Sequence, residues 1–462
     1  MNTLLEFNLD LIKKYDKAGP RYTSYPTAVV FNDSFGEEDY RKQAITSNEA
    51  NKGKPISLYF HIPFCDTLCF FCACNKIATK KRDKADTYLD YLEKEMAIVS
   101  KLYDKSRLVE QMHFGGGTPT FLTDEQFERM MSLIAKYFPL IHSEQRDYSI
   151  EIDPRSVTQQ SMKKLAGYGF NRFSLGVQDV NPVVQKAVNR IQPTQMTRDI
   201  IQACRDVNAR SISVDLIYGL PFQTLKSFAL TVDAVIEMSP DRLSVFNYAH
   251  LPHLFAPQKR IKAEDLPKAE EKLAILQMTI EKLTGAGYVY IGMDHFAKPD
   301  DELAIAQAKG TLQRNFQGYT THAELDLVAL GVSSISSVNN SFSQNVKSTE
   351  QYYAILDRGK LPIYRGYLLN DDDVLRKAVI QHLACHFALD FEKIEQEFSI
   401  DVTDYFAQEL DELKQMQRDK LITMDKKSIK VTPAGRLLIR NICMVFDVYL
   451  RKQKGQKFSK VI

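Results

Sequence analysis

Residues 59–74 read YFHIPFCDTLCFFCAC, and this short stretch holds four of the seven cysteines of the chain. Its first residues complete an apolar and aromatic run, residues 57–61, that predicts a β-strand. The four thiols follow the spacing C-x3-C-x2-C-x-C, at Cys65, Cys69, Cys72 and Cys74. An even spread of cysteines would not produce such a group, so the segment requires a chemical explanation.

Three ordinary roles for clustered cysteines do not fit this spacing. A disulfide scaffold needs more than seven cysteines in 462 residues, and the other three are scattered. A structural zinc site has a second pair of ligands about a dozen or more residues away, and none is visible. Ferredoxin clusters use other spacings. The alternative is a [4Fe–4S] cluster held by three thiolates, whose fourth iron is open to the amino and carboxylate groups of S-adenosylmethionine.

The spacing C-x3-C-x2-C after a first barrel strand is similar to the signature of the radical SAM superfamily. That pattern assigns Cys65, Cys69 and Cys72 to iron. Cys74 is open to three interpretations: a ligand in place of another, a substrate-side residue, or a mere neighbour of the cluster. We expect Cys74 to be free of iron, and we interpret the three scattered cysteines as small buried residues.

The composition excludes several classes of protein. A hydrophobic share of 44% excludes a disordered chain, and no apolar run is long enough for a membrane span. Lys and Arg number 60 against 58 Asp and Glu, and this balance favours neither nucleic acid nor a membrane surface as partner. The first residues show no secretory signal, so we expect a cytoplasmic protein with reduced thiols.

An alternation of strands and helices begins at the cysteine segment and predicts the fold. Six short runs indicate strands, at residues 57–61, 110–114, 148–152, 172–177, 213–217 and 243–248. Apolar residues between them recur at helical steps, as in Tyr88, Leu92, Met96, Val99 and Tyr103. Such βα units predict a parallel sheet with helices outside, and six are fewer than the eight of a complete barrel. We expect an α/β fold, a partial (β/α)6 TIM-like barrel open on one side.

The segments that flank the barrel have a different character. Residues 1–55 form a polar lead-in whose stretch GPRYTSYPT, at 19–27, predicts an extended arm. The last hundred residues are charged and mostly helical, with a short strand pair near 421–423 and 429–431. This pattern is compatible with either a winged-helix-like domain or a helical domain. We expect three parts: an N-terminal arm over 1–55, a catalytic barrel with its extension over 56–365, and a mostly helical C-terminal domain over 366–462.

Polar residues and glycines follow the ends of the predicted strands, where the active site of a barrel lies. Glycines 115–117 let a ligand approach the backbone closely. Glu151 is a candidate acceptor for a ribose hydroxyl or an ammonium group, with a solvated strand end as the equal alternative. Gln178 and Asp215 hold equivalent positions, whereas Arg190 by itself would be a surface residue.

Motifs along the whole chain resemble those of oxygen-independent coproporphyrinogen III oxidases, the anaerobic enzymes of haem synthesis. The resemblance runs from about residue 8 to the C-terminus. The matching stretches are residues 19–27, 59–74, 115–119, 170–172, 176–179, 215–221, 246–250, 292–296, 315–319 and 440–444. The first and the last are specific to this family within the superfamily.

The resemblance implies a [4Fe–4S] cluster and two molecules of S-adenosylmethionine in one active site. The family's motifs assign the first molecule to Tyr59, Gly116, Glu151 and Ile335. They assign the second to Phe71, Gly117, Thr118, Gln178, Arg190, Asp215 and Ala249. Ala73 stands where the family often has glycine, a difference that we expect to be tolerated.

The resemblance also implies the reaction. A 5′-deoxyadenosyl radical abstracts hydrogen from the β-carbon of a propionate of coproporphyrinogen III, and loss of CO2 and one electron leaves a vinyl group. Two such conversions give protoporphyrinogen IX. An electron donor and a final acceptor are required, and the sequence identifies neither.

Several residues on the substrate side have two interpretations. The substrate carries four carboxylates, so Arg21, Tyr22 and Tyr25 on the arm are candidate contacts; the alternative is a structural strap that packs on the barrel. His61 is as well placed to hold the cysteine loop as to move protons.

Two other functions are open for a barrel of this kind. The first is a haem-binding chaperone, whose known relatives lack Cys74 and the stretch 21–27. The second is a radical SAM methyltransferase that acts on haem. The presence of Cys74 and of that stretch favours the oxidase. A self-contained barrel with a helical cover leads us to expect a monomer.

Overall fold

The computed structural model describes residues 5–322 and 324–452. They form two compact units, each assembled from separate segments of the chain. Unit 2 carries the cysteine segment and comprises Phe31–Ile275 and Glu324–Leu368. Unit 1 comprises the described parts of Met1–Val30, Leu276–Ala323 and Leu369–Ile462. The division expected from the sequence, at residues 55 and 365, follows the order of the chain instead and stays a prediction.

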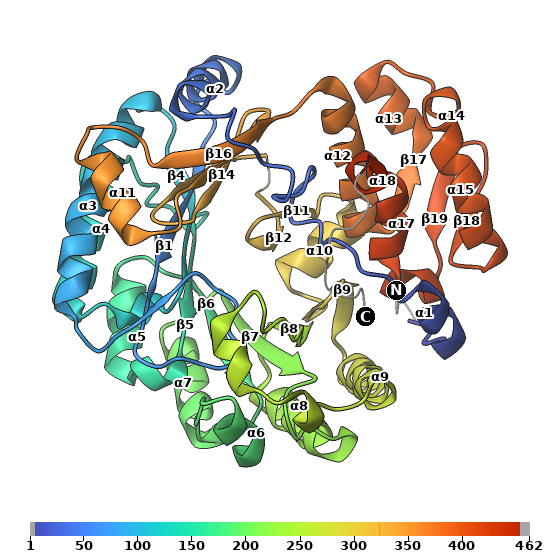
Figure 1. Cartoon of the computed structure of the whole chain (residues 1–462), viewed down its shortest axis with the longest axis horizontal. Helices are drawn as coiled ribbons and strands as arrows, with labels where there is room; N and C mark the ends of the chain where they lie inside the picture. Colours follow the sequence, from blue (N-terminus) through green and yellow to red (C-terminus); the bar gives the residue numbers. More distant parts are fainter. Residues whose placement is uncertain (1–4, 323, 453–462) are drawn as a thin grey trace. The chain divides into compact units, whose positions relative to one another are not determined.

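Parallel strands form the main part of the sheet in unit 2 (Figure 1). Six of them lie side by side in chain order: β1 (Ile56–Ile62), β4 (Val109–Gly116), β5 (Asp147–Ile152), β6 (Arg172–Gln178), β7 (Ser211–Tyr218) and β8 (Arg242–Asn247). Each lies within two residues of its predicted bounds. Burial alternates along β5, where Tyr148, Ile150 and Ile152 are buried and Glu151 is not, as the period of two requires.

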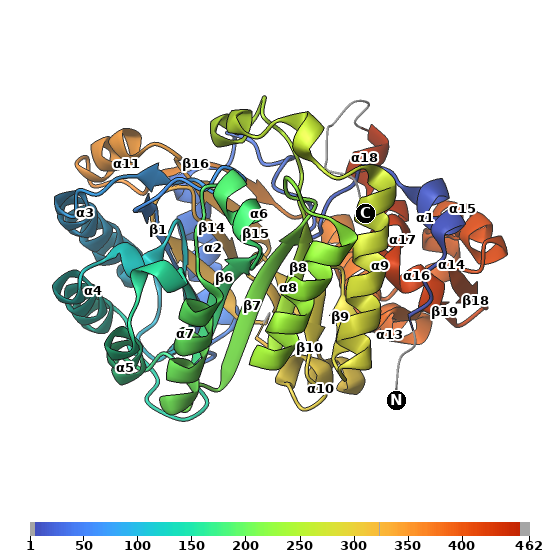
Figure 2. The same cartoon turned by 90° about the horizontal axis from the view of Figure 1, so that it is seen from below.

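Helices follow these strands and cover the outer side of the sheet (Figures 1 and 2). They are α3 (Asp83–Val99), α4 (Asp124–Tyr137), α5 (Gln159–Gly167), α6 (Pro182–Ala187), α7 (Thr194–Asp206) and α8 (Leu225–Met238). The sequence dictates α4 locally: Thr123 and Gln126 form a capping box, and Phe127, Met130 and Ile134 make one buried face. The predicted parallel sheet with helices on its outer side is thus present.

The sheet continues beyond β1, where the sequence analysis predicted no strand. β13 (Asp326–Leu330) pairs with β1 in parallel, on the side opposite to β4. Antiparallel strands then extend this edge, β14 (Ile335–Val338), β15 (Ser341–Asn345) and β16 (Ile363–Leu368). The first strand of the chain is therefore central, and so is the cysteine segment that follows it.

Three further helices and a strand pair complete unit 2. The strand pair is β2 (Phe64–Cys65) with β3 (Ile77–Ala78), and the helices are α2 (Glu37–Ala50), α11 (Thr349–Leu356) and the first part of α9 (Ala269–Gly285). A buried ion pair, Arg107 with Asp326 at 2.8 Å, ties the start of β13 to the loop before β4.

Unit 1 is mostly helical, as predicted for the C-terminal part of the chain. Its helices are α1 (Leu9–Tyr15), α10 (Glu302–Lys309), α12 (Asp371–His386), α13 (Phe391–Phe398), α14 (Val402–Tyr405), α15 (Ala407–Arg418), α16 (Pro433–Leu437), α17 (Ile439–Val445) and α18 (Val448–Lys452). The expected strand pair is present as β18 (Ile422–Met424) and β19 (Ser428–Val431), with β17 (Ala388–Asp390) as a third strand. Two hairpins complete the unit, β9 (Val289–Gly292) with β10 (His295–Ala297), and β11 (Gln313–Asn315) with β12 (Gly318–Thr320).

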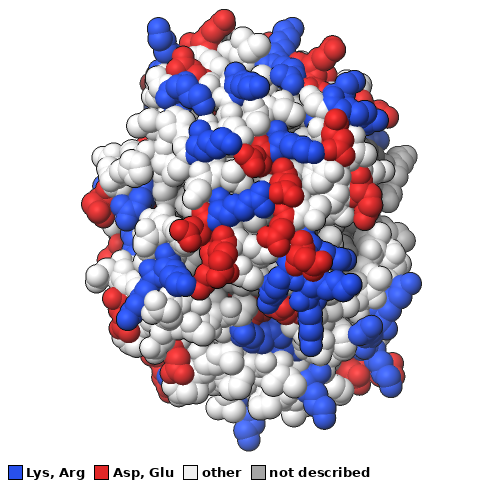
Figure 3. All heavy atoms as spheres, turned by 90° about the vertical axis from the view of Figure 1, so that its left-hand side faces the viewer, with Lys and Arg blue, Asp and Glu red and all other residues white. Residues whose placement is uncertain are grey.

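Charges of both signs are interspersed on the face of unit 2 that carries α3 and α4 (Figure 3). Three ion pairs on this face are Arg129 with Asp90, Lys136 with Glu93, and Lys94 with Asp357. Among the described residues, no helix combines the length and the apolar character needed to cross a membrane.

Candidate active site

The cysteine segment forms a loop that is closed at its base by β2 and β3. Phe64 pairs with Ile77 and Cys65 with Ala78, in parallel. The backbone N–H of Thr79 donates to the carbonyl oxygen of Cys65 at 2.9 Å. These contacts fix both ends of the loop at the carboxyl end of β1, so the thiols face the same edge of the sheet as the other strand ends.

Hydrogen-bond donors surround the first two thiols. The Thr118 hydroxyl donates to Cys65 Sγ at 3.4 Å. Two guanidinium groups approach Cys69 Sγ, from Arg155 at 3.6 Å and from Arg190 at 3.7 Å. Both arginines also bind Asp153, at 2.6 and 3.1 Å. Donors of this kind stabilise negative charge on sulfur, as a thiolate ligand of iron requires.

The third and fourth thiols interact with each other. The hydrogen bond with Cys74 and the nearby Lys76 ammonium group outweigh burial and lower the pKa of Cys72 to about 6. Cys65 differs, because burial raises the pKa of its thiol to about 11. Cys65 and Cys69 are buried, Cys72 is half-buried and Cys74 is exposed. The exposure of Cys74 separates it from the other three.

Polar side chains and glycines at the other strand ends lie at the same edge as the cysteine loop. Gly116 ends β4, Glu151 lies next to the end of β5, and Gln178 ends β6. Asp215 pairs in register with Gly176 of β6, and Ala249 follows β8. The carboxyl ends of parallel strands meet at one edge, and that geometry brings residues of five strands together.

Glu151 is held by β4 and keeps about half of its side chain exposed. Its carboxylate accepts from the backbone N–H of Gly116 at 3.3 Å and lies 3.5 Å from His113 Nε2, with 47% of the side chain exposed. Burial alone would raise the pKa of Glu151, but His113 and the Gly116 N–H outweigh it and lower the pKa. Glu151 is thus an ionised acceptor with an exposed side. This favours the role of ligand acceptor over that of a solvated residue at a strand end.

Several buried polar atoms at the ends of β6 and β8 have no hydrogen-bond partner in the described part of the chain. They are Gln178 Oε1, Arg190 Nε and Asn247 Oδ1. Arg190 is itself buried, where the sequence alone indicated a surface residue, and its Nη2 donates to the Gly176 carbonyl oxygen at 2.5 Å. Buried polar groups in native proteins are almost always paired, so these atoms fit a polar ligand.

Asp215 is a half-buried carboxyl group on β7 that pairs in register with Gly176 of β6. Burial raises its pKa to about 7, against the hydrogen bond from Ser244. The group can therefore change its charge near neutral pH.

Comparisons with known proteins agree along the whole chain. Residues 59–235 match the model of the radical SAM superfamily, and residues 369–438 match that of the HemN C-terminal domain. Oxygen-independent coproporphyrinogen III oxidases from Pseudomonas aeruginosa and Escherichia coli are 54% and 49% identical, over 99% of this chain and 99% of each relative. The solved structure of coproporphyrinogen III oxidase (HemN) from Escherichia coli superposes with a TM-score of 0.91 at 47% identity, covering 97% of this chain and all of that one.

The chain belongs to the oxygen-independent coproporphyrinogen III oxidase family. It is therefore a coproporphyrinogen III oxidase of the radical SAM type, an oxidoreductase of porphyrin biosynthesis. The radical SAM superfamily implies a [4Fe–4S] cluster and S-adenosylmethionine. The identity over the whole length favours the oxidase over the chaperone and the methyltransferase.

The three thiols assigned to iron lie on one loop, and two of them have N–H or O–H donors beside them, which suits thiolate ligands. No group of three or more Cys, His, Asp and Glu side chains among residues 5–322 and 324–452 is arranged to hold one metal ion. In a [4Fe–4S] cube each thiolate binds a different iron, so the sulfurs lie farther apart than around one ion.

The arm residues of the oxidase lie in unit 1. Arg21 binds Asp294 at 2.9 Å and keeps about a third of its side chain exposed. The buried Tyr22 hydroxyl donates to Asp447 at 3.0 Å, and Tyr25, also buried, accepts from the Val448 N–H. Both tyrosines have the contacts of a structural strap, whereas Arg21 retains an open side.

Two predicted residues at the site are apolar. Phe71 packs against a cluster formed by Val184, Val188, Leu220, Tyr248 and Ile261, and its carbonyl oxygen accepts from Gln258 at 3.0 Å. Ile335 begins β14 and is half-buried. Tyr59 stacks on His113 with ring centroids 5.7 Å apart.

The sequence analysis did not single out Asp153, Arg155 or His113. Asp153 directly follows β5, so a search of strand ends would have included it.

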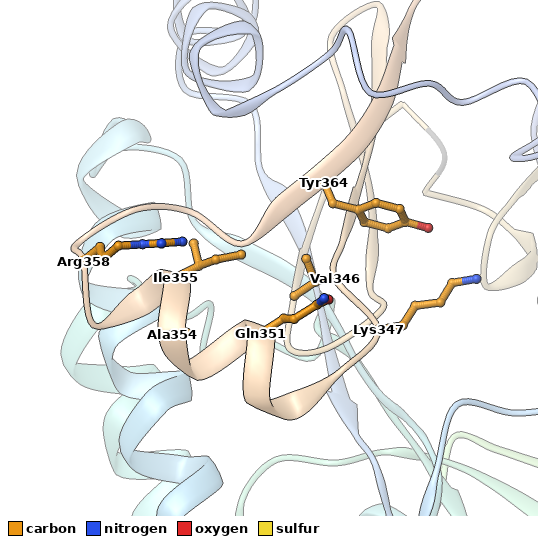
Figure 4. A pocket seen from close by; sticks show the side chains of 7 residues that line it. All are labelled: Val346, Lys347, Gln351, Ala354, Ile355, Arg358 and Tyr364. Carbon is orange, nitrogen blue, oxygen red and sulfur yellow. The ribbon is translucent and has the colours of Figure 1, made fainter.

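A separate pocket of unit 2 does not contain the predicted site. It has a volume of about 530 Å³ between α11 and the strands β15 and β16, and Figure 4 shows its lining. None of the predicted cofactor or iron ligands lines it.

Proposed function

We propose that the protein converts two propionate side chains of coproporphyrinogen III into vinyl groups, which gives protoporphyrinogen IX. It uses one [4Fe–4S] cluster and two molecules of S-adenosylmethionine. When bound, these cofactors supply a one-electron cleavage of the sulfonium and a 5′-deoxyadenosyl radical that removes hydrogen from the propionate. An electron donor and a final acceptor complete the reaction.

Cys65, Cys69 and Cys72 hold the cluster, and Cys74 does not bind iron. The observation that carries this assignment is the set of donors around the thiols, from Thr118, Arg155 and Arg190. They stabilise thiolates on the first two cysteines. Neither Cys72 nor Cys74 receives such a contact from the strand ends among the described residues; Cys72 differs from Cys74 in its smaller exposure and its lowered pKa.

The first S-adenosylmethionine is bound by Tyr59, Gly116, Glu151 and Ile335, and the second by Phe71, Gly117, Thr118, Gln178, Arg190, Asp215 and Ala249. Glu151 offers an ionised acceptor for an ammonium group or a hydroxyl. The unpartnered atoms of Gln178 and Arg190 support a polar ligand beside β6. Gly116 and Gly117 leave room for it, because their backbone carries no Cβ.

The decisive experiment is anaerobic turnover. The cluster is reconstituted without oxygen, reductant, S-adenosylmethionine and coproporphyrinogen III are added, and CO2 and vinyl product are measured. We expect two CO2 per protoporphyrinogen IX. Intact substrate, despite a full cluster and formation of 5′-deoxyadenosine, would refute the proposal, and tight haem binding without turnover would indicate the chaperone.

A further inference from the structure

Arg314 is a buried cation of unit 1 whose guanidinium group has no carboxylate partner among the described residues. It lies on β11 and is 5% exposed. Its Nε and Nη1 atoms have no hydrogen-bond partner in the described chain. Leaving a charge buried and unpaired is costly, so the arrangement requires an explanation.

Gln381 of helix α12 holds the backbone of Arg314 in position. The Arg314 backbone N–H donates to Gln381 Oε1 at 3.0 Å, and its carbonyl oxygen accepts from Gln381 Nε2. The guanidinium group stacks on the Tyr319 ring, 4.7 Å from its centroid. The Tyr319 hydroxyl donates in turn to the Ala384 carbonyl oxygen at 3.1 Å. The backbone and the guanidinium plane are thus both fixed, and no contact within residues 5–322 and 324–452 neutralises the charge.

Other arginines of unit 1 add positive charge near Arg314. The buried Arg440 donates to the carbonyl oxygens of Gly19 and Pro20, which are neutral acceptors. Burial lowers the pKa of Arg440 to about 10, and the charges of Arg21 and Arg314 act in the same direction. Asp294 opposes them, but it already binds Arg21. Arg440 is therefore acted on by the positive charges of both Arg21 and Arg314 and by the negative charge of Asp294.

We infer that Arg314 binds a carboxylate of the porphyrinogen substrate, in an anion site of unit 1 whose guanidinium group is positioned by Tyr319 and Gln381. Guanidinium groups pair with carboxylates through charge-assisted hydrogen bonds, which are stronger than neutral ones. The inference rests on the proposed function, because it takes the tetracarboxylate as substrate. It adds a substrate contact outside the arm and outside the strand ends.

The first test measures binding without turnover. The reconstituted holoenzyme, without reductant, is titrated with coproporphyrin III, the stable oxidised form with the same four carboxylates, and its fluorescence is followed. Arg314→Gln should weaken binding by at least about tenfold, and Arg314→Lys should restore part of it. The tetramethyl ester has no charged carboxylate, so its affinity should not depend on residue 314.

The matched control is Arg436→Gln. Arg436 also lies in unit 1, stacks on an aromatic ring (Phe387, at 4.6 Å) and has an Nε atom without a partner, but it is only half-buried. Its replacement should change coproporphyrin affinity by less than about twofold. In turnover, Arg314→Gln should raise KM with little change in kcat, with iron content and S-adenosylmethionine cleavage as in the unmodified enzyme.

The outcomes separate this inference from the proposed function. A folded Arg314→Gln enzyme that binds coproporphyrin III as tightly as the unmodified one would overturn the inference. An unmodified enzyme with a full cluster that neither binds nor converts the tetracarboxylate would refute the proposed function. If Arg314→Gln does not fold, Arg314→Lys decides: reduced preference for the free acid over the ester supports the inference, and an unchanged preference contradicts it.

Discussion

The imidazole Nε2 of His61 donates a hydrogen bond to the carbonyl oxygen of Asn75, at 2.9 Å. This contact ties β1 to the residue that follows the last clustered cysteine. Burial lowers the pKa of His61 and keeps the ring neutral. Because Nε2 carries the proton, Nδ1 accepts from the Tyr59 hydroxyl at 3.2 Å. Both nitrogens are thus engaged, which favours the interpretation that His61 holds the loop over the one in which it moves protons.

Replacement of His61 should loosen the cysteine loop. His61→Phe keeps a ring of similar volume but removes both hydrogen bonds, of which the one to Asn75 holds the loop, so iron should be lost to a chelator about fivefold faster. The matched control is His250→Phe, which removes a similar pair, with the Tyr248 hydroxyl 3.0 Å from His250 Nδ1, outside the loop. Normal iron retention in His61→Phe, combined with a lost limb of the pH–rate profile, would indicate proton transfer instead.

The four clustered cysteines should differ in their effect on iron. Cys65→Ser, Cys69→Ser and Cys72→Ser should each abolish the cluster, because three thiolates are the minimum set on this loop. Cys74→Ser should retain it. Iron and sulfide content and the visible absorption of anaerobically reconstituted protein provide the measurement. Loss of iron from Cys74→Ser would show that the ligand assignment is wrong.

Gly117 should not tolerate a side chain. A Cβ there would lie 2.7 Å from the Phe64 carbonyl oxygen and 2.8 Å from the Pro63 carbonyl carbon, which are backbone atoms. Gly117→Ala should therefore displace the start of the cysteine loop and lower iron content. Gly167→Ala is the control, since a Cβ at the end of α5 meets no atom within 4 Å. Equal iron content in the two variants would contradict the expectation.

Binding of the second S-adenosylmethionine should depend on pH through Asp215. Its pKa near 7 means that the carboxyl group is mostly protonated at pH 6 and mostly ionised at pH 8. An ionised Asp215 accepts hydrogen bonds from the ligand, so affinity should rise by about tenfold over this interval. The Asp215→Asn variant should bind the ligand weakly, and its affinity should not change between pH 6 and pH 8. Calorimetric titration checks this, and a retained slope in Asp215→Asn would assign the titration to another group.

Glu95 should make stability fall with rising pH. It is buried and accepts from Gly331 N–H, Asn345 and Tyr352, yet burial outweighs these contacts and raises its pKa from 4.5 to about 7. The folded state binds the Glu95 proton more tightly than the unfolded state does. Protonation of Glu95 therefore stabilises the fold fully below about pH 4.5, and this stabilisation is lost as pH rises through 7. The loss can reach about 3 kcal/mol.

Chemical denaturation at pH 5 and pH 8 tests the role of Glu95. The Glu95→Gln side chain cannot titrate, so the free energy of unfolding of this variant should fall less between pH 5 and pH 8. Glu93→Gln, at a partly exposed residue paired with Lys136, should retain the full decrease. Identical slopes in the unmodified protein and Glu95→Gln would show that another group dominates.

Local pattern was sufficient for the barrel strands and for the helices α4 and α8. Their apolar spacing and caps lie within a few residues, so the sequence contains the whole signal. β13 was missed because its five residues gain their meaning from pairing with β1, at Ile56 with Asp326. No periodicity can reveal a partner so distant in the chain.

In the candidate site, too, some residues could be predicted from the sequence and others could not. Glu151, Gln178 and Asp215 could be predicted because parallel strands end at one edge. Arg155 could not, since its contact with Cys69 joins residues 86 positions apart. The burial of Tyr22 likewise depends on Asp447, 425 positions later. Contacts of this length need the folded chain.

The assembly of unit 1 from three chain segments has a consequence for protein synthesis. Gly19 and Pro20 bind Arg440, and Tyr22 binds Asp447, so these residues find partners that are translated more than 400 positions later. Unit 2 is complete at residue 368, while unit 1 still lacks its longest segment. During translation the barrel can fold first on the ribosome. The contacts of Gly19, Pro20 and Tyr22 must wait until residues 440–447 are translated, so a stop codon shortly after residue 368 would leave a folded barrel beside an unformed unit 1.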